Sequence, residues 1–149
     1  MIDALAFPLK LPFHFTVTKI LGSWAKPFIG RILVKQILKQ IMYDSNKISE
    51  EQVEAYTFPF QMPGGKEAFI QTLQNFNQKE LEDLSLHYQN IQVPILVIWG
   101  EKDVWIPISH FQRLSQTFPK AIKILISNCG HIPQEECPSE VSQAILKFL

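Results

Sequence analysis

The pattern of apolar and polar positions changes character near residue 89. Before that point apolar residues recur with helical spacing, which is typical of amphipathic helices. After it, two short apolar runs, Ile95–Trp99 and Ile122–Ile126, are separated by a helical pattern over Pro107–Phe118. A further helical pattern covers Ser139–Leu149. This order of strand, helix, strand and helix predicts a parallel sheet covered by helices on both faces.

The region before residue 89 predicts helices and irregular connections. Its longest helical pattern covers Ile29–Met42, where Arg31, Lys35 and Lys39 share one face and apolar residues gather on the other. Such a basic amphipathic helix can lie on a membrane or contact a partner, but it is more often a helix whose lysines face water. Shorter helical patterns cover residues 17–24, 69–76 and 79–86.

Ser49 predicts the start of another helix. Its hydroxyl and the side chain of Gln52, three residues later, form a capping box. We expect this helix to end by Tyr56, because Pro59 lacks the backbone N–H that a helix interior uses. A turn at Met62–Gly65 follows.

Each of the two apolar runs is followed by a titratable side chain. Asp103 lies in the turn after Gly100, and His131 follows Gly130 directly. Because the carboxyl ends of parallel strands meet at one edge of a sheet, we expect the acid and the imidazole to lie there together. They are two parts of a device in which an acid orients a base and the base activates a nucleophile.

Composition narrows the class of protein. The chain has 149 residues, of which 46% are hydrophobic and 19% charged, with a formal net charge of zero. These values are ordinary for a globular domain and give no reason to expect nucleic acid as a partner. No run approaches the ~18 apolar residues of a transmembrane helix. Cys129 and Cys137 have neither zinc-site nor disulfide spacing, which favours a reducing cytoplasm.

Two loop motifs resemble those of the α/β-hydrolase fold family. Pro94–Pro107 looks like the strand and loop that carry the family's acid, and Gly130-His131-Ile132-Pro133, followed by Glu136, resembles its histidine loop. The order of acid before histidine also agrees with the family. The resemblance implies an α/β fold with a small parallel sheet and flanking helices. It further implies a catalytic triad in which Asp103 is the acid and His131 the base, with no cofactor and no metal.

The resemblance covers only the second half of the family fold. It implies that residues 1–6 are a vestigial strand of the hydrolase sheet, that residues 7–88 are a helical cap, and that residues 89–149 are the C-terminal strand-helix-strand-helix part of the core. The family's nucleophile lies in a Gly-x-Ser-x-Gly turn, which this chain lacks, since Gly22-Ser23 has neither the flanking glycines nor a strand before it. The oxyanion-hole loop, an early element of the family fold, is missing too.

The leading hypothesis is therefore a truncated C-terminal portion of a serine-type ester or C–C bond hydrolase. It carries the acid and the histidine, and we expect it to be inactive alone for want of a nucleophile. One alternative is half of a split hydrolase, complemented by an N-terminal half on another polypeptide. The other is a non-catalytic module that binds an apolar ligand, a partner or a membrane surface. The substrate, small and apolar in a complete enzyme, depends on the geometry of the cap and pocket.

The other candidate residues have simpler interpretations. Glu136 is expected to tie the histidine loop to the last helix, and Asp3 to be an inherited strand-end residue. Cys129 is interpreted as a small buried hydrophobe rather than a nucleophile. Because a sheet of so few strands leaves an open edge, we expect the isolated chain to be poorly soluble, oligomeric or partly unfolded.

Overall fold

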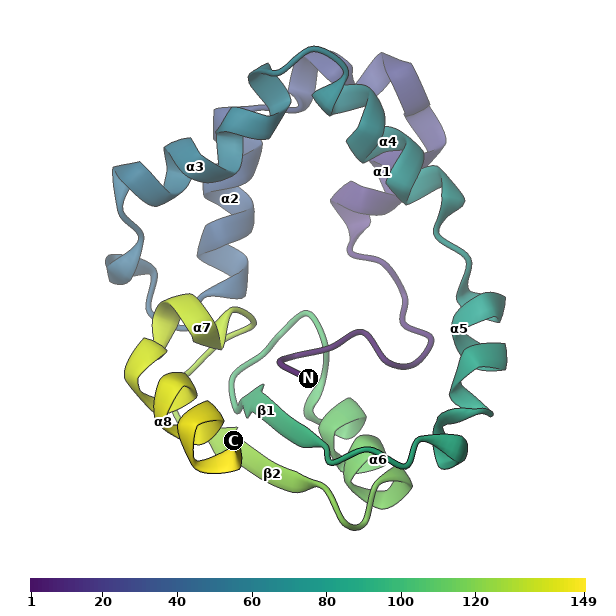
Figure 1. Ribbon diagram of the computed structural model, residues 1–149. Helices are drawn as coiled ribbons and strands as arrows, with labels where there is room; N and C mark the ends of the chain where they lie inside the picture. Colours follow the sequence, from purple (N-terminus) through teal and green to yellow (C-terminus); the bar gives the residue numbers. More distant parts are fainter.

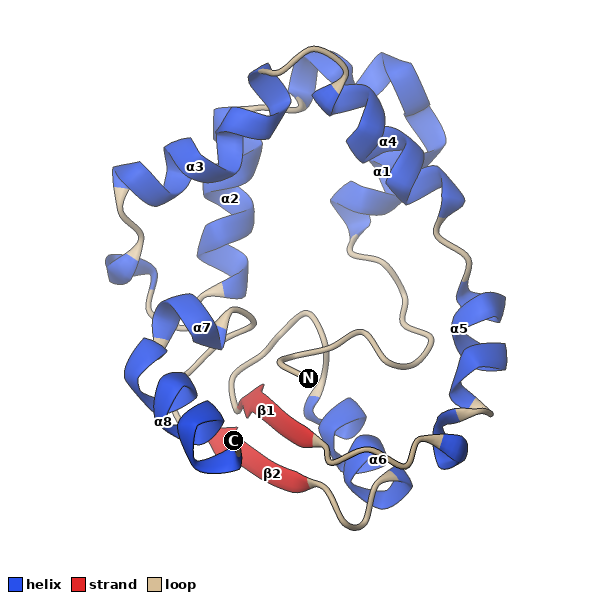
Figure 2. Ribbon diagram, viewed as in Figure 1, coloured by secondary structure: helices blue, strands red, loops and turns tan.

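Two parallel strands form the sheet in the computed structural model, which describes residues 1–149. Strand β1 (Leu96–Gly100) pairs with β2 (Ile122–Ile126) in a register that runs from Leu96 opposite Ile122 to Gly100 opposite Ile126. Helix α6 (Ile108–Thr117) connects them, and α8 (Pro138–Phe148) follows (Figure 2). The strand-helix-strand-helix prediction is confirmed, and the strands are parallel as expected.

The N-terminus adds a fragment of a third strand on the edge of β1 that β2 leaves free. Ile2 forms a single parallel bridge with Ile98. The backbone N–H of Ile98 donates to the carbonyl of Met1 over 2.8 Å, and the N–H of Asp3 donates to the carbonyl of Ile98 over 3.1 Å. Beyond this short fragment the sheet edge has no further partner in the chain.

The remaining helices form an arch over the sheet (Figure 1). Helices α1 to α4 form the top of the arch in this view, the C-terminal end of α2 extends down toward α7 (Pro133–Glu136), and α5 runs back toward β1. None of the helices combines the length and apolar content needed to cross a bilayer. The helical elements before β1 are α1 (Phe13–Leu21), the 3₁₀ helix η1 (Gly22–Phe28), α2 (Arg31–Ile41), η2 (Ser45–Lys47), α3 (Glu50–Gln61), α4 (Gly65–Asn75), α5 (Gln78–Ser85) and η3 (Tyr88–Asn90).

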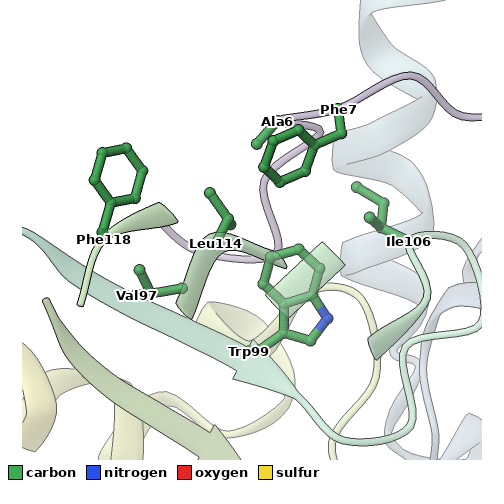
Figure 3. Close-up of a cluster of buried hydrophobic side chains, with 7 residues drawn as sticks. All are labelled: Ala6, Phe7, Val97, Trp99, Ile106, Leu114 and Phe118. Carbon is green, nitrogen blue, oxygen red and sulfur yellow. The ribbon is translucent and has the colours of Figure 1, made fainter. Parts of the chain in front are cut away.

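Alternate residues of β1 supply two separate cores, because successive side chains of a strand point to opposite faces. Val97 and Trp99 pack with Leu114 and Phe118 around α6 (Figure 3). Leu96 and Ile98 face the other way. They pack with Ile126 of β2 and with Val141 and Ala144 of α8.

Strand β1 is buried along its whole length, as predicted for a sheet with both faces covered. Strand β2 differs, since Ile122 and Leu125 remain 49% and 44% exposed. The edge strand is therefore only half covered by the helices of this chain.

Several helix boundaries were predicted wrongly. Helix α1 begins at Phe13 rather than at residue 17, and α4 begins at Gly65 rather than at residue 69. The largest difference is at the end of α3. Helix α3 begins as expected after Ser49, whose Oγ accepts a hydrogen bond from the N–H of Gln52 over 3.0 Å. It does not end by Tyr56 but continues through Pro59 to Gln61. Pro59 removes one hydrogen bond, but Phe60 directly after it packs on Phe69 of α4 at a ring-centre distance of 5.3 Å, and this tertiary packing keeps the last turn helical.

Candidate active site

The carboxylate of Asp103 closes the loop after β1. Its Oδ1 accepts hydrogen bonds from the N–H groups of Trp105 and Ile106 over 2.8 and 2.9 Å. The side chain is completely buried. These bonds orient the carboxylate and leave its second oxygen, Oδ2, for another donor.

That donor is His131, which follows β2. Its Nδ1 lies 2.9 Å from Oδ2 of Asp103. Because an ionised carboxylate only accepts hydrogen bonds, Nδ1 carries the proton, and Nε2 is the nitrogen left to exchange a proton with a substrate or nucleophile. The imidazole is one-fifth exposed, and it packs against Trp105 with a ring-centre distance of 5.6 Å. The structure thus brings together both residues predicted for the site.

The two loops approach each other so closely that glycine is required where they meet. A Cβ added to Gly100 would lie 2.0 Å from the carbonyl oxygen of Gly130 and 2.6 Å from that of Cys129. The N–H of Lys102 also donates to the carbonyl of Cys129 over 2.9 Å. Backbone contact therefore sets the distance between the acid and the imidazole.

Asp3 follows the N-terminal strand fragment and is bonded to Gly100, and it makes no hydrogen bond with the imidazole. Its carboxyl accepts a hydrogen bond from the N–H of Gly100 over 3.0 Å, and its backbone has a positive φ of 35°. The pKa of Asp3 is raised to about 8, mainly by burial and to a smaller extent by the charge of Asp103, and the Gly100 hydrogen bond opposes this rise. Asp3 is therefore mainly uncharged at neutral pH, and Asp103 is the main negative charge next to His131.

Glu136 makes contacts that the sequence analysis did not anticipate. Its buried carboxylate accepts a hydrogen bond from Gly130 of the histidine loop, as expected for a tie to that loop. Its other partners are the N–H groups of Tyr43 and Asp44, which follow α2, rather than groups of the last helix. The sequence motif predicted that Glu136 would contact the histidine loop, but nothing in it predicted the hydrogen bonds to Tyr43 and Asp44.

Two other kinds of candidate are a cysteine nucleophile and a cluster of metal ligands. Cys129 is fully buried, and that burial raises the pKa of its thiol, so the thiol stays protonated. Asp, Glu, His and Cys side chains do not gather in any group of three or more that could hold a metal ion.

A row of aromatic rings leads from His131 into the helical region. Trp105, which packs on the imidazole, meets Phe15 of α1 at a ring-centre distance of 5.1 Å. Phe15 meets Phe69 of α4 at 5.9 Å, and Phe69 meets Phe60 of α3 at 5.3 Å. The side of the imidazole that faces these helices is therefore lined by aromatic rings, and His14, which packs on Phe15 and Trp105, is the polar member among them.

Comparison with known proteins identifies the family of the chain. A sequence model of the alpha/beta hydrolase fold family matches residues 37–138. The chain belongs to this family.

Among its relatives, the chain is 27% identical over 127 residues to an uncharacterized hydrolase of Bacillus subtilis, YugF, and covers 45% of that protein. It is 30% identical over 119 residues to a 2-hydroxy-6-oxononadienedioate/2-hydroxy-6-oxononatrienedioate hydrolase of Burkholderia vietnamiensis, of which it covers 40%. The matches take in 85% and 78% of this chain. The chain thus spans less than half the length of these two relatives.

Solved structures show the same fold. A crystal structure of an α/β-hydrolase fold protein from Burkholderia ambifaria superimposes with a TM-score of 0.79 at 25% identity, over 98% of this chain and 54% of the other. A meta-cleavage product hydrolase from Pseudomonas fluorescens also reaches a TM-score of 0.79, at 17% identity and over 99% of this chain and 53% of the other. Nearly the whole chain therefore corresponds to about half of a hydrolase fold.

Proposed function

We propose that this chain supplies the acid and the base of a serine-type hydrolase whose nucleophile comes from outside residues 1–149. The observation that carries the proposal is the hydrogen bond of 2.9 Å between Nδ1 of His131 and Oδ2 of Asp103. In this proposal residues 7–88 form the cap over the site, and residues 89–149 form the C-terminal part of the core. Residues 1–6 are the remnant of the preceding strand.

The chemistry follows from the protonation of the imidazole. Nε2 of His131 accepts the proton of an incoming serine hydroxyl as that hydroxyl attacks an ester or a ketone carbonyl. The same nitrogen then returns the proton to the leaving group. Asp103 holds the Nδ1–H tautomer and stabilises the imidazolium that forms.

The proposed substrate class rests on the names of the relatives and on the row of aromatic rings next to His131. The Burkholderia vietnamiensis relative is named as a hydrolase of 2-hydroxy-6-oxononadienedioate, so carbon–carbon bond cleavage next to a ketone is one candidate reaction. Ester hydrolysis uses the same residues in the same order. The rings of Phe15, Phe60 and Phe69 favour an apolar acyl or alkyl group, and therefore a substrate less polar than the dicarboxylate in the name of that relative.

An apolar groove marks where the nucleophile-bearing half would pack. It has a volume of about 520 Å³ and lies beside the N-terminal strand fragment, with Met1, Ile2, Leu96 and Phe148 among its hydrophobic lining residues. An open sheet edge next to exposed apolar side chains favours pairing with another strand. That strand belongs either to residues preceding this segment in a longer polypeptide or to a separate polypeptide.

The deciding experiment is p-nitrophenyl ester turnover by the chain alone and together with a half that carries a Gly-x-Ser-x-Gly turn, encoded upstream of residue 1 or by a neighbouring reading frame. We expect no turnover and no labelling by a fluorophosphonate from the chain alone. We expect turnover from the combination, and its loss in His131→Ala. Turnover that is unchanged in His131→Ala and Asp103→Asn would overturn the proposal.

The non-catalytic alternative finds less support. Its main candidate for membrane binding is the basic face of α2, but these cations are largely paired within the chain. Arg31 forms ion pairs with Glu50 and Glu54 of α3, and Lys35 pairs with Glu50 over 2.7 Å. A binding activity that survives both Asp103→Asn and His131→Ala unchanged would favour this alternative.

A further inference from the structure

The carboxylate of Glu136 joins two segments that are far apart in the sequence. It accepts hydrogen bonds from the N–H groups of Gly130 over 2.6 Å, Asp44 over 2.7 Å and Tyr43 over 3.2 Å. The residue is only 3% exposed. Three backbone donors directed at one buried carboxylate are charge-assisted hydrogen bonds, which are stronger than bonds between neutral groups.

Two further contacts tighten the same junction. The N–H of His131 itself donates to the carbonyl of Ile41, the last residue of α2, over 2.7 Å. The ammonium group of Lys47 donates to the backbone carbonyl of Glu136 over 3.0 Å. The end of α2 is therefore bonded directly to the peptide group between Gly130 and His131. The residues after α2 are bonded to the helical turn that carries Glu136, and through the Glu136 carboxylate to the N–H of Gly130.

The junction has no spare room. A Cβ added to Gly130 would lie 2.2 Å from the carbonyl oxygen of Ile41 and 2.7 Å from the backbone nitrogen of Tyr43. Real Cβ atoms do not approach backbone so closely, so the histidine loop and the end of α2 are in direct backbone contact. A displacement of one segment must therefore displace the other.

We propose that Glu136 is a positioning residue that couples the end of α2 to the imidazole of His131. It fixes the N–H of Gly130, while Ile41 fixes the N–H of His131, and the imidazole is thereby held where Nδ1 meets Asp103. This inference rests on the proposed role of His131 as the base. It adds that the position of the helical region at Ile41–Asp44 sets the orientation of that base.

A matched pair of variants tests the coupling in the full 149-residue chain. Glu136→Gln keeps the size of the side chain but turns one acceptor into a donor that faces a backbone N–H. Glu135→Gln makes the same chemical change at the neighbouring position, where the carboxylate contacts Gln52 and Tyr56 of α3 at the exposed surface. The control thus removes a contact to the helical region that does not pass through the backbone of the histidine loop.

The first readout is the low-field proton resonance of Nδ1 of His131, assigned by its disappearance in Asp103→Asn. We expect this resonance to be lost or broadened by exchange in Glu136→Gln and to be retained in Glu135→Gln. The second readout is amide hydrogen exchange at Tyr43, Asp44 and Gly130, which we expect to accelerate roughly 10- to 100-fold in Glu136→Gln alone. An unchanged His131 resonance in folded Glu136→Gln would overturn the proposal, because a merely structural role would change only the melting temperature.

The unmodified chain provides a second test if Glu136→Gln does not fold. Coupling requires that the amides of Tyr43, Asp44 and Gly130 open as one unit, with equal opening free energies and equal denaturant dependence. Independent opening of Gly130 and Asp44 would overturn the coupling. Both tests are made without turnover, so an inactive combination with these results intact would contradict the proposed function and leave the coupling standing.

Discussion

The two ends of β1 present opposite kinds of surface. At its carboxyl end, Gly100 and Gly130 are in backbone contact, and the carboxyl groups of Asp3, Asp103 and Glu136 all have hydrogen-bond partners. Along the N-terminal fragment and the start of the strand, the surface is an open apolar groove lined by residues such as Met1 and Ile95. The comparison indicates that contacts within this chain hold Asp103 and His131 together, whereas the sheet edge beside the N-terminal fragment is left open.

The largest expected effect comes from Gly100→Ala. The new methyl group would meet the carbonyl oxygen of Gly130 at 2.0 Å, so the acid loop and the histidine loop must separate. We expect a loss of roughly 3 kcal/mol or more in the free energy of unfolding, measured by urea denaturation, together with loss of the His131 Nδ1 resonance. Gly30→Ala is the control, because nothing lies within 4 Å of the corresponding Cβ. A small and equal effect of both changes would contradict the close contact.

The next effect concerns Asp3 and depends on pH. Its pKa of about 8 in the folded chain lies above the ordinary value of 3.8, so the folded state binds the proton more tightly than the unfolded state. The stabilisation by protonated Asp3 is complete below about pH 4 and is lost as the pH rises through about 8. Asp3→Asn, which keeps an acceptor for Gly100 and tolerates the positive φ, should therefore remove most of this loss, on the order of 2–4 kcal/mol.

Urea denaturation of the unmodified chain and of Asp3→Asn at pH 5 and pH 9 measures this difference. Parallel pH profiles for the two chains would show that Asp3 is not the group that titrates. An opposite slope, with the unmodified chain gaining stability from Asp3 as the pH rises, would mean that the carboxylate is stabilised rather than the acid.

Asp103→Asn should change the free energy of unfolding less than the two preceding substitutions, but it should strongly lower the catalytic rate. The Asn side chain can still accept from Trp105 and Ile106, but its amide presents N–H groups to Nδ1 and favours the other imidazole tautomer. We expect a loss of about 1–3 kcal/mol in stability and, in an active combination with a nucleophile half, a decrease in kcat of about 10³- to 10⁴-fold. Retention of the low-field His131 resonance in this variant would contradict the assigned tautomer.

The smallest effect on stability is expected at the groove. Ile91 lines it and is 44% exposed, so Ile91→Ser should change the free energy of unfolding by no more than about 0.5 kcal/mol. It should nevertheless reduce self-association in sedimentation and weaken binding of a nucleophile half. Ile32→Ser, at a more exposed position on α2 outside the groove, should change neither. If the two variants self-associate and bind a nucleophile half equally well, the groove is not the surface through which the chain associates.

Much of this site was predictable because its parts are local in sequence. Asp103 follows the strand that ends at Gly100, and His131 follows the next strand, so parallel pairing alone places both at one edge. The helix start at Ser49 was likewise predictable from neighbouring residues, but the predicted capping box is only half formed, because the Gln52 side chain donates to Glu135 instead of bonding back to Ser49. The end of α3 was not predictable, because local propensity at Pro59 counts the missing N–H and does not include the packing that keeps the last turn helical.

The order of the elements, the two loop motifs and the absence of a Gly-x-Ser-x-Gly turn from residues 1–149 can all be read from the amino-acid sequence. The bonds of Glu136 to Tyr43 and Asp44, and the protonation of Asp3 that follows from its burial near Asp103, depend on the folded arrangement. Periodicity and turn chemistry act between neighbours in the chain, whereas the partners of a buried carboxylate are chosen by packing between segments some 90 residues apart.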